Sequence, residues 1–461
     1  MASDKKEGTG TNRSRTPNSK EFLDYISSGW QESSNKAIPP SSAADFAKER
    51  RDQVAAAFPN QLVVIEAGAP KTRSNDTEYR YRPHAAFAHL TGWGSETVPD
   101  SVLVIDNKGS NQILFLRPTA GKASDEFFAN PAIGEFWVGA RPTLEDVSGL
   151  LKIETRDLKE LSAYLDKKKK TISLEDSELA QFVSELRLVK DSYEIDQMRQ
   201  AVASSIRGFE DIVQALPKAA KNPRGERIIE TAFFARARLE GNDLGYDTIA
   251  AAGKNACILH WITNHGPVNS GELVLVDAGI EMDSLYTADI TRTLPINGQY
   301  SEAQLEIYQA VLEAADAAFA VAKPGIKFRQ IHEAAMKVIA HKVAGWGMLP
   351  VSAEESLEAD KQFHRRWMVH GTSHHLGLDV QDSAQARKEM YLEAELKEGM
   401  IFTIEPGLYF HENDLLAPER FRGIGVRIED DVLVTKDGVE NLSAKLPRTP
   451  ADIESWMASL S

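Results

Sequence analysis

The sequence predicts an α/β protein with two folded domains behind a polar amino-terminal tail. The chain has 461 residues, and at roughly 100–200 residues per domain this length corresponds to two or three domains. Short apolar runs, typical of buried strands, alternate with segments of helical periodicity in both halves of the chain. Because 42% of the residues are hydrophobic and 26% are charged, the composition is that of a chain that can bury a sizeable core.

Residues 1–40 and 41–187 differ in character. The first segment is rich in Ser, Thr, Asn, Gly and Lys and lacks the apolar run of a secretory signal. We therefore expect a flexible tail, with a short amphipathic piece around residues 22–30. The second segment is expected to form an α/β domain. Its strands are predicted at 61–67, 101–105 and 112–116, and its helices at 44–57 and after Thr143 and Asp157.

The second domain is expected to span residues 188–461 and to be α/β as well. Asp191 is followed three residues later by Glu194, which is the capping-box pattern that opens a helix, and Pro217 is expected to end this helix. Ser301 and Gln304 cap another helix, which is predicted to run to residue 324. Further helices are predicted at 225–239 and 330–343, and strands at 272–277, 289–294, 400–405 and 425–434.

Composition excludes several classes of protein. The formal net charge of −15 argues against a general nucleic-acid binder, which needs a basic face. The single cysteine, Cys257, excludes an intrachain disulfide and a cysteine zinc finger, and it fits a reducing compartment. No apolar stretch reaches the length of a membrane helix, so no membrane partner is expected. The expected location is the cytoplasm.

Four carboxylates lie at or beside the ends of predicted strands in the second domain. Asp277 ends an apolar strand before a glycine turn, and alternation places Asp289 on the same strand face as Thr291. Glu405 and Glu429 follow two further apolar strands. Each carboxylate alone could be a turn cap or a solvated strand tip. That explanation is weak for all four together, because a buried carboxylate needs a partner or a metal.

A histidine cluster occurs in the run HGTSHHLGLD, which begins at His370. His370 and His374 are four residues apart, a spacing that would place them on one face of a helix. Gly371 and Gly377 make a regular helix improbable, and Gly371 stands where the helical zinc-protease signature needs Glu. The cluster is therefore either a metal or catalytic site on a loop, or a chance grouping.

Taken together, the two Asp, two Glu and one His form a coherent ligand set. Four converging carboxylates repel one another and could not all ionise without cations. Two divalent ions would solve this problem, and oxygen ligands with one imidazole suit Mn²⁺, Zn²⁺, Co²⁺ or Fe²⁺. Such a pair can hold and ionise a water molecule.

The motifs around these residues identify a family. With DAG, DITRT, HGTSHHLGLD, TIEPGLY and GIGVRIEDD, the chain resembles the aminopeptidase P and prolidase group of metallopeptidases from about residue 191 to 443. The resemblance implies a catalytic domain with the pita-bread fold, which methionine aminopeptidase shares. Residues 87–105 resemble the amino-terminal domain of the family more loosely. The implied substrates are peptides with proline at the second position.

The resemblance also implies roles for individual residues. Asp277 would chelate one ion, His374 and Glu405 would hold the other, and Asp289 and Glu429 would bridge the two ions. A bridging water or hydroxide would be the nucleophile, with Glu405 as proton acceptor. Mn²⁺ is the expected metal, with Zn²⁺ or Co²⁺ as alternatives. The implied substrate contacts and pocket positions are His260, His370, Arg427, Tyr409 and Tyr246.

One position departs from the family pattern. Where the family usually has a histidine near the scissile bond, this chain has Gln381, which can form hydrogen bonds but cannot supply a proton near neutral pH. We therefore expect His370 to carry more of the proton transfer.

Several functions stay in competition, among them hydrolysis of phosphotriesters at the same dinuclear site as a side activity. The favoured one is an Xaa-Pro aminopeptidase. A prolidase restricted to dipeptides is the closest rival, with Arg387 as the candidate grip on a free carboxylate. A non-catalytic pita-bread binding or chaperone protein ranks third, because all five ligands are present. A homodimer or homotetramer is expected from the resemblance.

Overall fold

The computed structural model describes residues 17, 19–31, 38–75, 77–106, 111–122, 124, 126–140, 142–166 and 170–460. The chain divides into two compact units, Met1–Ala180 and Gln181–Ser461. The predicted tail lies largely outside the described residues, apart from a short helix, α1 (Lys20–Ser27), at the predicted amphipathic piece. In the described part of the chain, no helix combines the length and apolarity needed to cross a membrane.

The first unit is built on a five-stranded mixed sheet with the order β6-β5-β4-β1-β7. The three predicted strands form its centre, where β1 and β5 each pair antiparallel with β4, because their apolar side chains can be buried there. The strands are β1 (Leu62–Glu66), β4 (Val102–Asp106), β5 (Asn111–Leu116), β6 (Glu154–Asp157) and β7 (Thr171–Ile172), with a small hairpin of β2 (Thr72–Ser74) and β3 (Thr77–Glu78). The helices are α2 (Ala44–Ala57), α3 (Ala85–Thr91), α4 (Glu126–Ala129), α5 (Glu135–Val138), α6 (Leu144–Leu151) and α7 (Leu161–Leu165).

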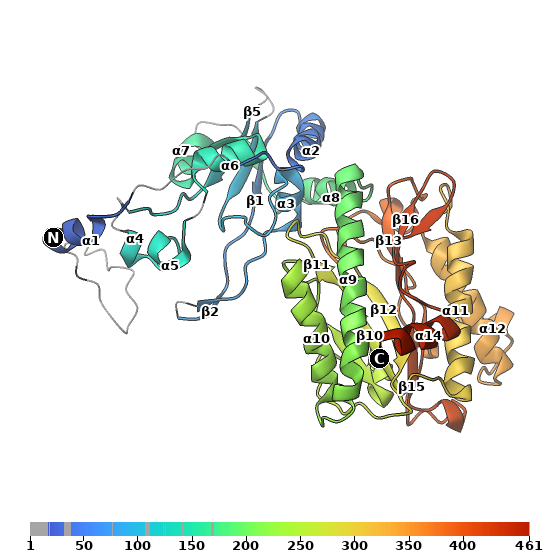
Figure 1. The fold of residues 1–461 in the computed structure, drawn as a ribbon. Coiled ribbons are helices and arrows are strands. Elements are labelled where there is room, and N and C mark those ends of the chain that lie inside the picture. The colour runs from blue at the N-terminus through green and yellow to red at the C-terminus, as the bar shows by residue number, and fades with distance from the viewer. Residues whose placement is uncertain are drawn as a thin grey trace, which may run out of the picture. The chain divides into compact units, whose positions relative to one another are not determined.

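The second unit places strands between two pairs of helices (Figure 1). Helix α9 (Ser192–Ala219) packs on α10 (Gly225–Glu240), and α11 (Glu302–Val321) packs on α12 (Arg329–Gly345). The predicted capping boxes of α9 and α11 both form, since each cap side chain accepts the expected backbone N–H. Shorter helices are α8 (Ser177–Leu186), which begins before the division, α13 (Ala353–Ser356) and α14 (Pro450–Leu460).

Two antiparallel sheets of this unit contain the strands at or beside whose ends the four carboxylates were predicted. In one, β10 (Leu273–Ala278) lies between β9 (Ile249–Ala252) and β12 (Ile290–Pro295). In the other, β16 (Asp430–Val434) lies between β13 (Ile401–Ile404) and β17 (Val439–Asn441). Two-stranded pairs are formed by β14 (Gly407–Phe410) with β15 (Ile424–Arg427), and by β8 (Asp243–Leu244) with β11 (Ile280–Glu281). The apolar faces of these strands and of the four long helices form one continuous core.

Two expectations about this unit are wrong. Helix α9 does not end at Pro217 but continues to Ala219, because a proline near the end of a helix removes one donor while the Ala220 N–H still bonds to the Leu216 carbonyl. The segment 425–434 is not one strand. It breaks after Arg427, since β15 pairs with β14 whereas β16 pairs with β13. Glu429 lies at this break.

Candidate metal-dependent active site

Asp277 and Asp289 come from neighbouring strands. Asp277 lies near the end of β10 opposite Thr291 of β12, and Asp289 immediately precedes β12. The Tyr246 hydroxyl lies between them, 2.7 Å from Asp277 Oδ1 and also in contact with an Asp289 oxygen. Asp277 also accepts a hydrogen bond of 2.5 Å from Arg427 Nη2. The hairpin therefore holds both carboxylates side by side.

Glu405 and Glu429 are brought to the same place by the second sheet. Glu405 follows β13, and its backbone N–H donates to the Thr372 carbonyl at 2.8 Å. Glu429 occupies the break between β15 and β16, where its N–H donates to the Thr291 carbonyl and its Oε2 accepts from the Thr291 hydroxyl at 2.7 Å. The two sheets are thus joined at the carboxylates themselves.

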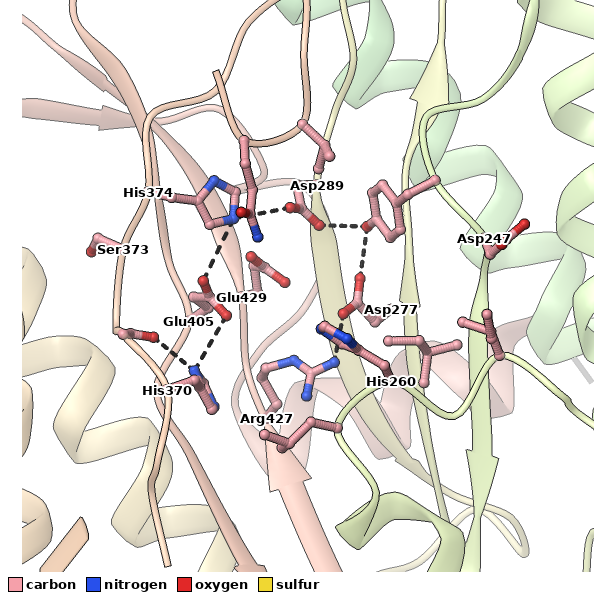
Figure 2. Close-up of a pocket in the computed structure, with 17 residues that line it drawn as sticks. Asp247, His260, Asp277, Asp289, His370, Ser373, His374, Glu405, Arg427 and Glu429 are labelled. Carbon is pink, nitrogen blue, oxygen red and sulfur yellow. Dashed lines mark hydrogen bonds and ion pairs between the residues drawn. The ribbon is translucent and has the colours of Figure 1, made fainter. Parts of the chain in front are cut away.

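His374 completes the cluster from a loop rather than from a helix. Its Nε2 lies 3.3 Å from Asp289 Oδ2 and 3.5 Å from Glu405 Oε1. Ligand atoms of Asp289, His374 and Glu429 lie within 4.8 Å of one another. Figure 2 shows the four side chains of Asp289, His374, Glu405 and Glu429 gathered around one region.

Burial raises the proton affinity of three of these carboxylates. Desolvation, reinforced by the neighbouring carboxylates, raises the pKa of Glu429 well above its usual value, and burial raises the pKa of Glu405 to about 7. Burial also raises the pKa of Asp289. Although burial opposes its charged form, the hydrogen bond to Asp289 and the charge of Glu405 raise the pKa of His374 to about 9.

These shifts test whether the residues fit divalent ions, and they do. The positively charged side chains of the site do not balance the negative charge of its carboxylates. Protons or metal ions must therefore neutralise the remaining charge. Oxygen ligands with a single imidazole are a donor set that Mn²⁺, Zn²⁺ and Co²⁺ accept. The five predicted ligands therefore lie together in an arrangement suited to divalent metal ions.

A network of hydrogen bonds leads away from the ligands. Arg427 donates from Nη1 to the Tyr409 hydroxyl at 3.0 Å and from Nε to the Thr291 hydroxyl at 3.1 Å. The Tyr409 hydroxyl also lies 2.7 Å from His370 Nε2. His370 Nδ1 lies 2.7 Å from the Gly371 carbonyl. Burial, together with the charge of Arg427, lowers the pKa of His370 to about 3, so its imidazole is neutral near pH ~7.

The cluster lies in a pocket of about 490 Å³. All five predicted ligands line it, as do four of the predicted substrate or catalytic positions: Tyr246, His260, His370 and Arg427. Gln381 also lines it, with an exposed side chain. Tyr409 is buried behind the pocket and reaches it through His370 and Arg427. An apolar wall that the sequence did not reveal consists of Ile249, Leu259, Ile262 and Val380.

Arg387 differs from its expected placement. It does not line the pocket, and its guanidinium forms two hydrogen bonds with Glu185, at 2.7 and 2.8 Å. The exposed bidentate pair is satisfied without a substrate carboxylate. The structure therefore gives no support to Arg387 as a grip on the carboxylate of a dipeptide.

A further carboxylate near the ligands escaped the sequence analysis. Asp431 is fully buried, and its Oδ2 accepts a hydrogen bond of 3.1 Å from the Asp289 backbone N–H. Burial, reinforced by Asp289, raises its pKa well above the usual value. The available signal was the two-residue period of the strand, which places Asp431 on the same face as Glu429.

Comparisons with known proteins agree with this geometry. Residues 196–436 match metallopeptidase family M24, and residues 47–174 match the aminopeptidase P amino-terminal domain. Xaa-Pro aminopeptidase 1 of Streptomyces coelicolor is 45% identical over 96% of this chain and 93% of that protein. Zinc-substituted aminopeptidase P of Escherichia coli in complex with product superposes with a TM-score of 0.79 at 28% identity, covering 91% of this chain and 99% of that one. Aminopeptidase PepP of Pseudomonas aeruginosa has a TM-score of 0.77 at 28% identity, covering 92% and 99%.

The fold and the site together define a two-domain metal-dependent peptidase, with a catalytic domain of the pita-bread type. Within that class, the chain belongs to the aminopeptidase P family.

Proposed function

We propose specific roles for the residues of this pocket in the release of an amino-terminal residue that precedes proline. The protein is an Xaa-Pro aminopeptidase, a hydrolase of the bond between the first residue and a following proline. The observation that carries this function is the convergence of the five predicted ligand side chains in one pocket of a chain whose two domains both match the family. A bond to proline has no N–H, so the pocket must recognise the ring and the amino terminus instead.

The metal centre is proposed to hold two divalent ions, most favourably Mn²⁺, with Zn²⁺ or Co²⁺ as alternatives. The ligands would be Asp277, Asp289, His374, Glu405 and Glu429, whose oxygen-rich donor set supports this choice. When bound, such ions ionise a water molecule and polarise the scissile carbonyl.

Glu405 is the proposed proton carrier. The family resemblance implies this role, in which the carboxylate accepts a proton from the attacking water and returns it to the departing proline nitrogen. His370 is proposed to act as a neutral hydrogen-bonding group held by Tyr409, rather than as the main proton donor. This differs from the expectation drawn from Gln381 alone.

The substrate is proposed to bind between His260 and the apolar wall. His260 has an exposed side chain on the pocket lining, where it can donate a hydrogen bond to a peptide carbonyl. Gln381 is proposed to add a hydrogen bond, while Tyr246 and Arg427 hold Asp277 in place. The apolar residues Ile249 and Leu259 supply a surface for the proline ring.

The test compares an Arg-Pro-Pro tripeptide with an Arg-Pro dipeptide after chelation and reloading with Mn²⁺. Turnover of the tripeptide to free arginine, lost on chelation and restored by metal, is expected. Turnover of the dipeptide alone would favour the prolidase alternative. Absence of turnover together with absence of bound metal would favour the non-catalytic alternative.

We also propose that the protein works in the cytoplasm as a homodimer or homotetramer. The single, buried cysteine is compatible with a reducing compartment, and the family resemblance supports the assembly. Light scattering on the full chain should give two or four times the mass of one chain, and a single-chain mass would contradict the assembly.

A further inference from the structure

Glu226 is one of the fully buried carboxylates of the catalytic domain outside the predicted metal-binding set. Glu226 lies in the first turn of α10. Its Oε1 accepts hydrogen bonds of 2.8 Å from the Ala252 N–H and from Asn255 Nδ2. Its Oε2 accepts from the Trp261 indole N–H at 2.8 Å and from the Gly266 N–H at 2.6 Å. All four donors are neutral, and no ion pair is formed by Glu226 among the described residues.

The four donors share one location, the segment 252–266, which begins at the last residue of β9 and leads toward β10. This segment carries Leu259, His260 and Ile262 of the pocket lining. After Ala252, which ends β9, and a short 3₁₀ turn at Gly253–Cys257, it has no regular structure, so this part of the backbone lacks the hydrogen bonds of a sheet. The Glu226 carboxylate replaces them, and the neighbouring Arg227 adds a hydrogen bond of 2.8 Å to the carbonyl of Thr263.

Two physical features favour a carboxylate at this position. The amino-terminal turn of a helix stabilises a negative charge, and hydrogen bonds to an ionised acceptor are stronger than neutral ones. Close approach of the backbone is possible because residue 266 is glycine. A Cβ on Gly266 would lie 2.9 Å from Glu226 Oε2 and 2.7 Å from Asn255 Nδ2.

We propose that Glu226 is a positioning residue for the substrate site. Its carboxylate fixes the segment 252–266 and thereby places His260 against the bound peptide. The inference rests on the proposed function in one respect, because it takes His260 to contact substrate. It assigns no proton transfer to Glu226, which does not line the pocket.

An isosteric substitution tests the carboxylate group of Glu226 while keeping the size and shape of the side chain. In Glu226→Gln, either orientation of the amide would turn an NH₂ group toward two N–H donors, because each carboxylate oxygen accepts two of them. Buried donors would lose their acceptor, and the segment would shift or loosen. The matched control is Glu240→Gln at the other end of α10, where the carboxylate pairs with Arg207 and Arg236 and does not touch the segment.

The experiment measures kcat/KM on a Xaa-Pro-Xaa tripeptide with the metal-loaded full chain, in the wild-type and His260→Ala backgrounds. Glu226→Gln should lower kcat/KM about 10- to 100-fold in the wild-type background, as expected for a misplaced contact. In the His260→Ala background the further loss should be less than about 2-fold, since the two residues act as one unit. Hydrogen exchange of peptides from 252–266 should rise, and Glu240→Gln should change neither quantity.

An equal loss in both backgrounds, or unchanged exchange in the segment, would overturn the proposal. If His260→Ala alone keeps full activity, the substrate role of His260 fails. Raised hydrogen exchange in Glu226→Gln would then still show that Glu226 fixes the segment 252–266. Unchanged hydrogen exchange would overturn that part of the proposal as well. If Glu226→Gln yields no folded protein, Trp261→Phe serves as the second variant, because it removes one of the four donors to Glu226. If Trp261→Phe lowers kcat/KM by the same factor in the wild-type and His260→Ala backgrounds, the proposal is overturned.

Discussion

Three carboxylates in the pocket bind protons more tightly than free carboxylates do. Asp289, Glu405 and Glu429 are removed from water, and burial raises the pKa of all three. The Arg427 guanidinium contacts Asp277, and its charge offsets only part of the rise in the pKa of Glu405 and Glu429. Divalent ions would supply the missing positive charge, so each ligand is expected to contribute strongly to metal affinity.

Replacing Glu429 by glutamine should remove metal and activity. Glu429→Gln keeps the shape of the side chain but lacks the charge that a bridging ligand needs, so kcat should fall more than about 100-fold. Atomic absorption on dialysed protein measures the bound metal. The control Glu440→Gln changes an exposed residue of β17 and should leave both values unaltered. Full metal content in Glu429→Gln would contradict the ligand assignment.

Gln381 offers a gain-of-function test. Its exposed side chain lines the pocket, where an imidazole could donate a proton and an amide cannot. Gln381→His should therefore keep activity or raise kcat/KM, up to about 10-fold. Gln385→His, at an exposed position that does not line the pocket, is the control. Complete loss of turnover in Gln381→His would refute this account of the position.

At the scale of elements, the site depends on how closely chain segments approach one another. Asp277 and Asp289 flank the connection between β10 and β12, and this connection passes Gly279 against the Ala288 backbone. The two strands can hold their carboxylates side by side only because no side chain intervenes. On the opposite sheet, the change of partner between β15 and β16 turns Glu429 toward the Thr291 backbone.

Gly279→Ala should therefore disrupt the metal centre through the backbone. A Cβ at this position would lie 1.6 Å from the Ala288 carbonyl oxygen, so the hairpin must open. We expect a loss of about 3 kcal/mol in the free energy of unfolding, together with weaker metal binding. Denaturant unfolding and metal titration measure the two effects. Gly345→Ala, whose Cβ would meet no atom within 4 Å, should be nearly neutral, and similar behaviour of both variants would contradict the argument.

At the scale of the whole molecule, the site belongs entirely to the second compact unit. Within that unit one sheet contributes Asp277 and Asp289, and the other contributes Glu405 and Glu429. Metal ions held by the proposed ligands from both sheets would bind the folded state and not the unfolded chain. Their binding is therefore linked to global stability.

Metal should stabilise the protein more at high pH than at low pH. Glu405, with a folded pKa of about 7, stabilises the metal-free fold fully below its unfolded pKa, and this contribution is lost as pH rises through about 7. His374 has a folded pKa of about 9, so it also stabilises the metal-free fold at low pH, and this contribution is lost as pH rises through about 9. The increase in Tm on adding Mn²⁺ should thus be larger at pH ~8 than at pH ~5.5, by about 5 °C. An equal or smaller increase at the higher pH would contradict the assignment.

The sequence by itself determined the features that depend on near neighbours. Capping boxes at Asp191 and Ser301 formed as predicted, because cap and partner are three residues apart. The apolar strands that end near the five ligands were equally visible, since a short apolar run is a local pattern. The family motifs surround those same strand ends.

Only the tertiary structure decided the features that need distant partners. Arg387 meets Glu185 across a sequence separation of 202 residues, and Asp289 meets Asp431 across 142. The break in 425–434 follows from pairing with two different strands, and the role of Glu226 follows from four donors on a separate segment. Local periodicity carries no information on such contacts, because the packing of the whole domain selects which groups meet.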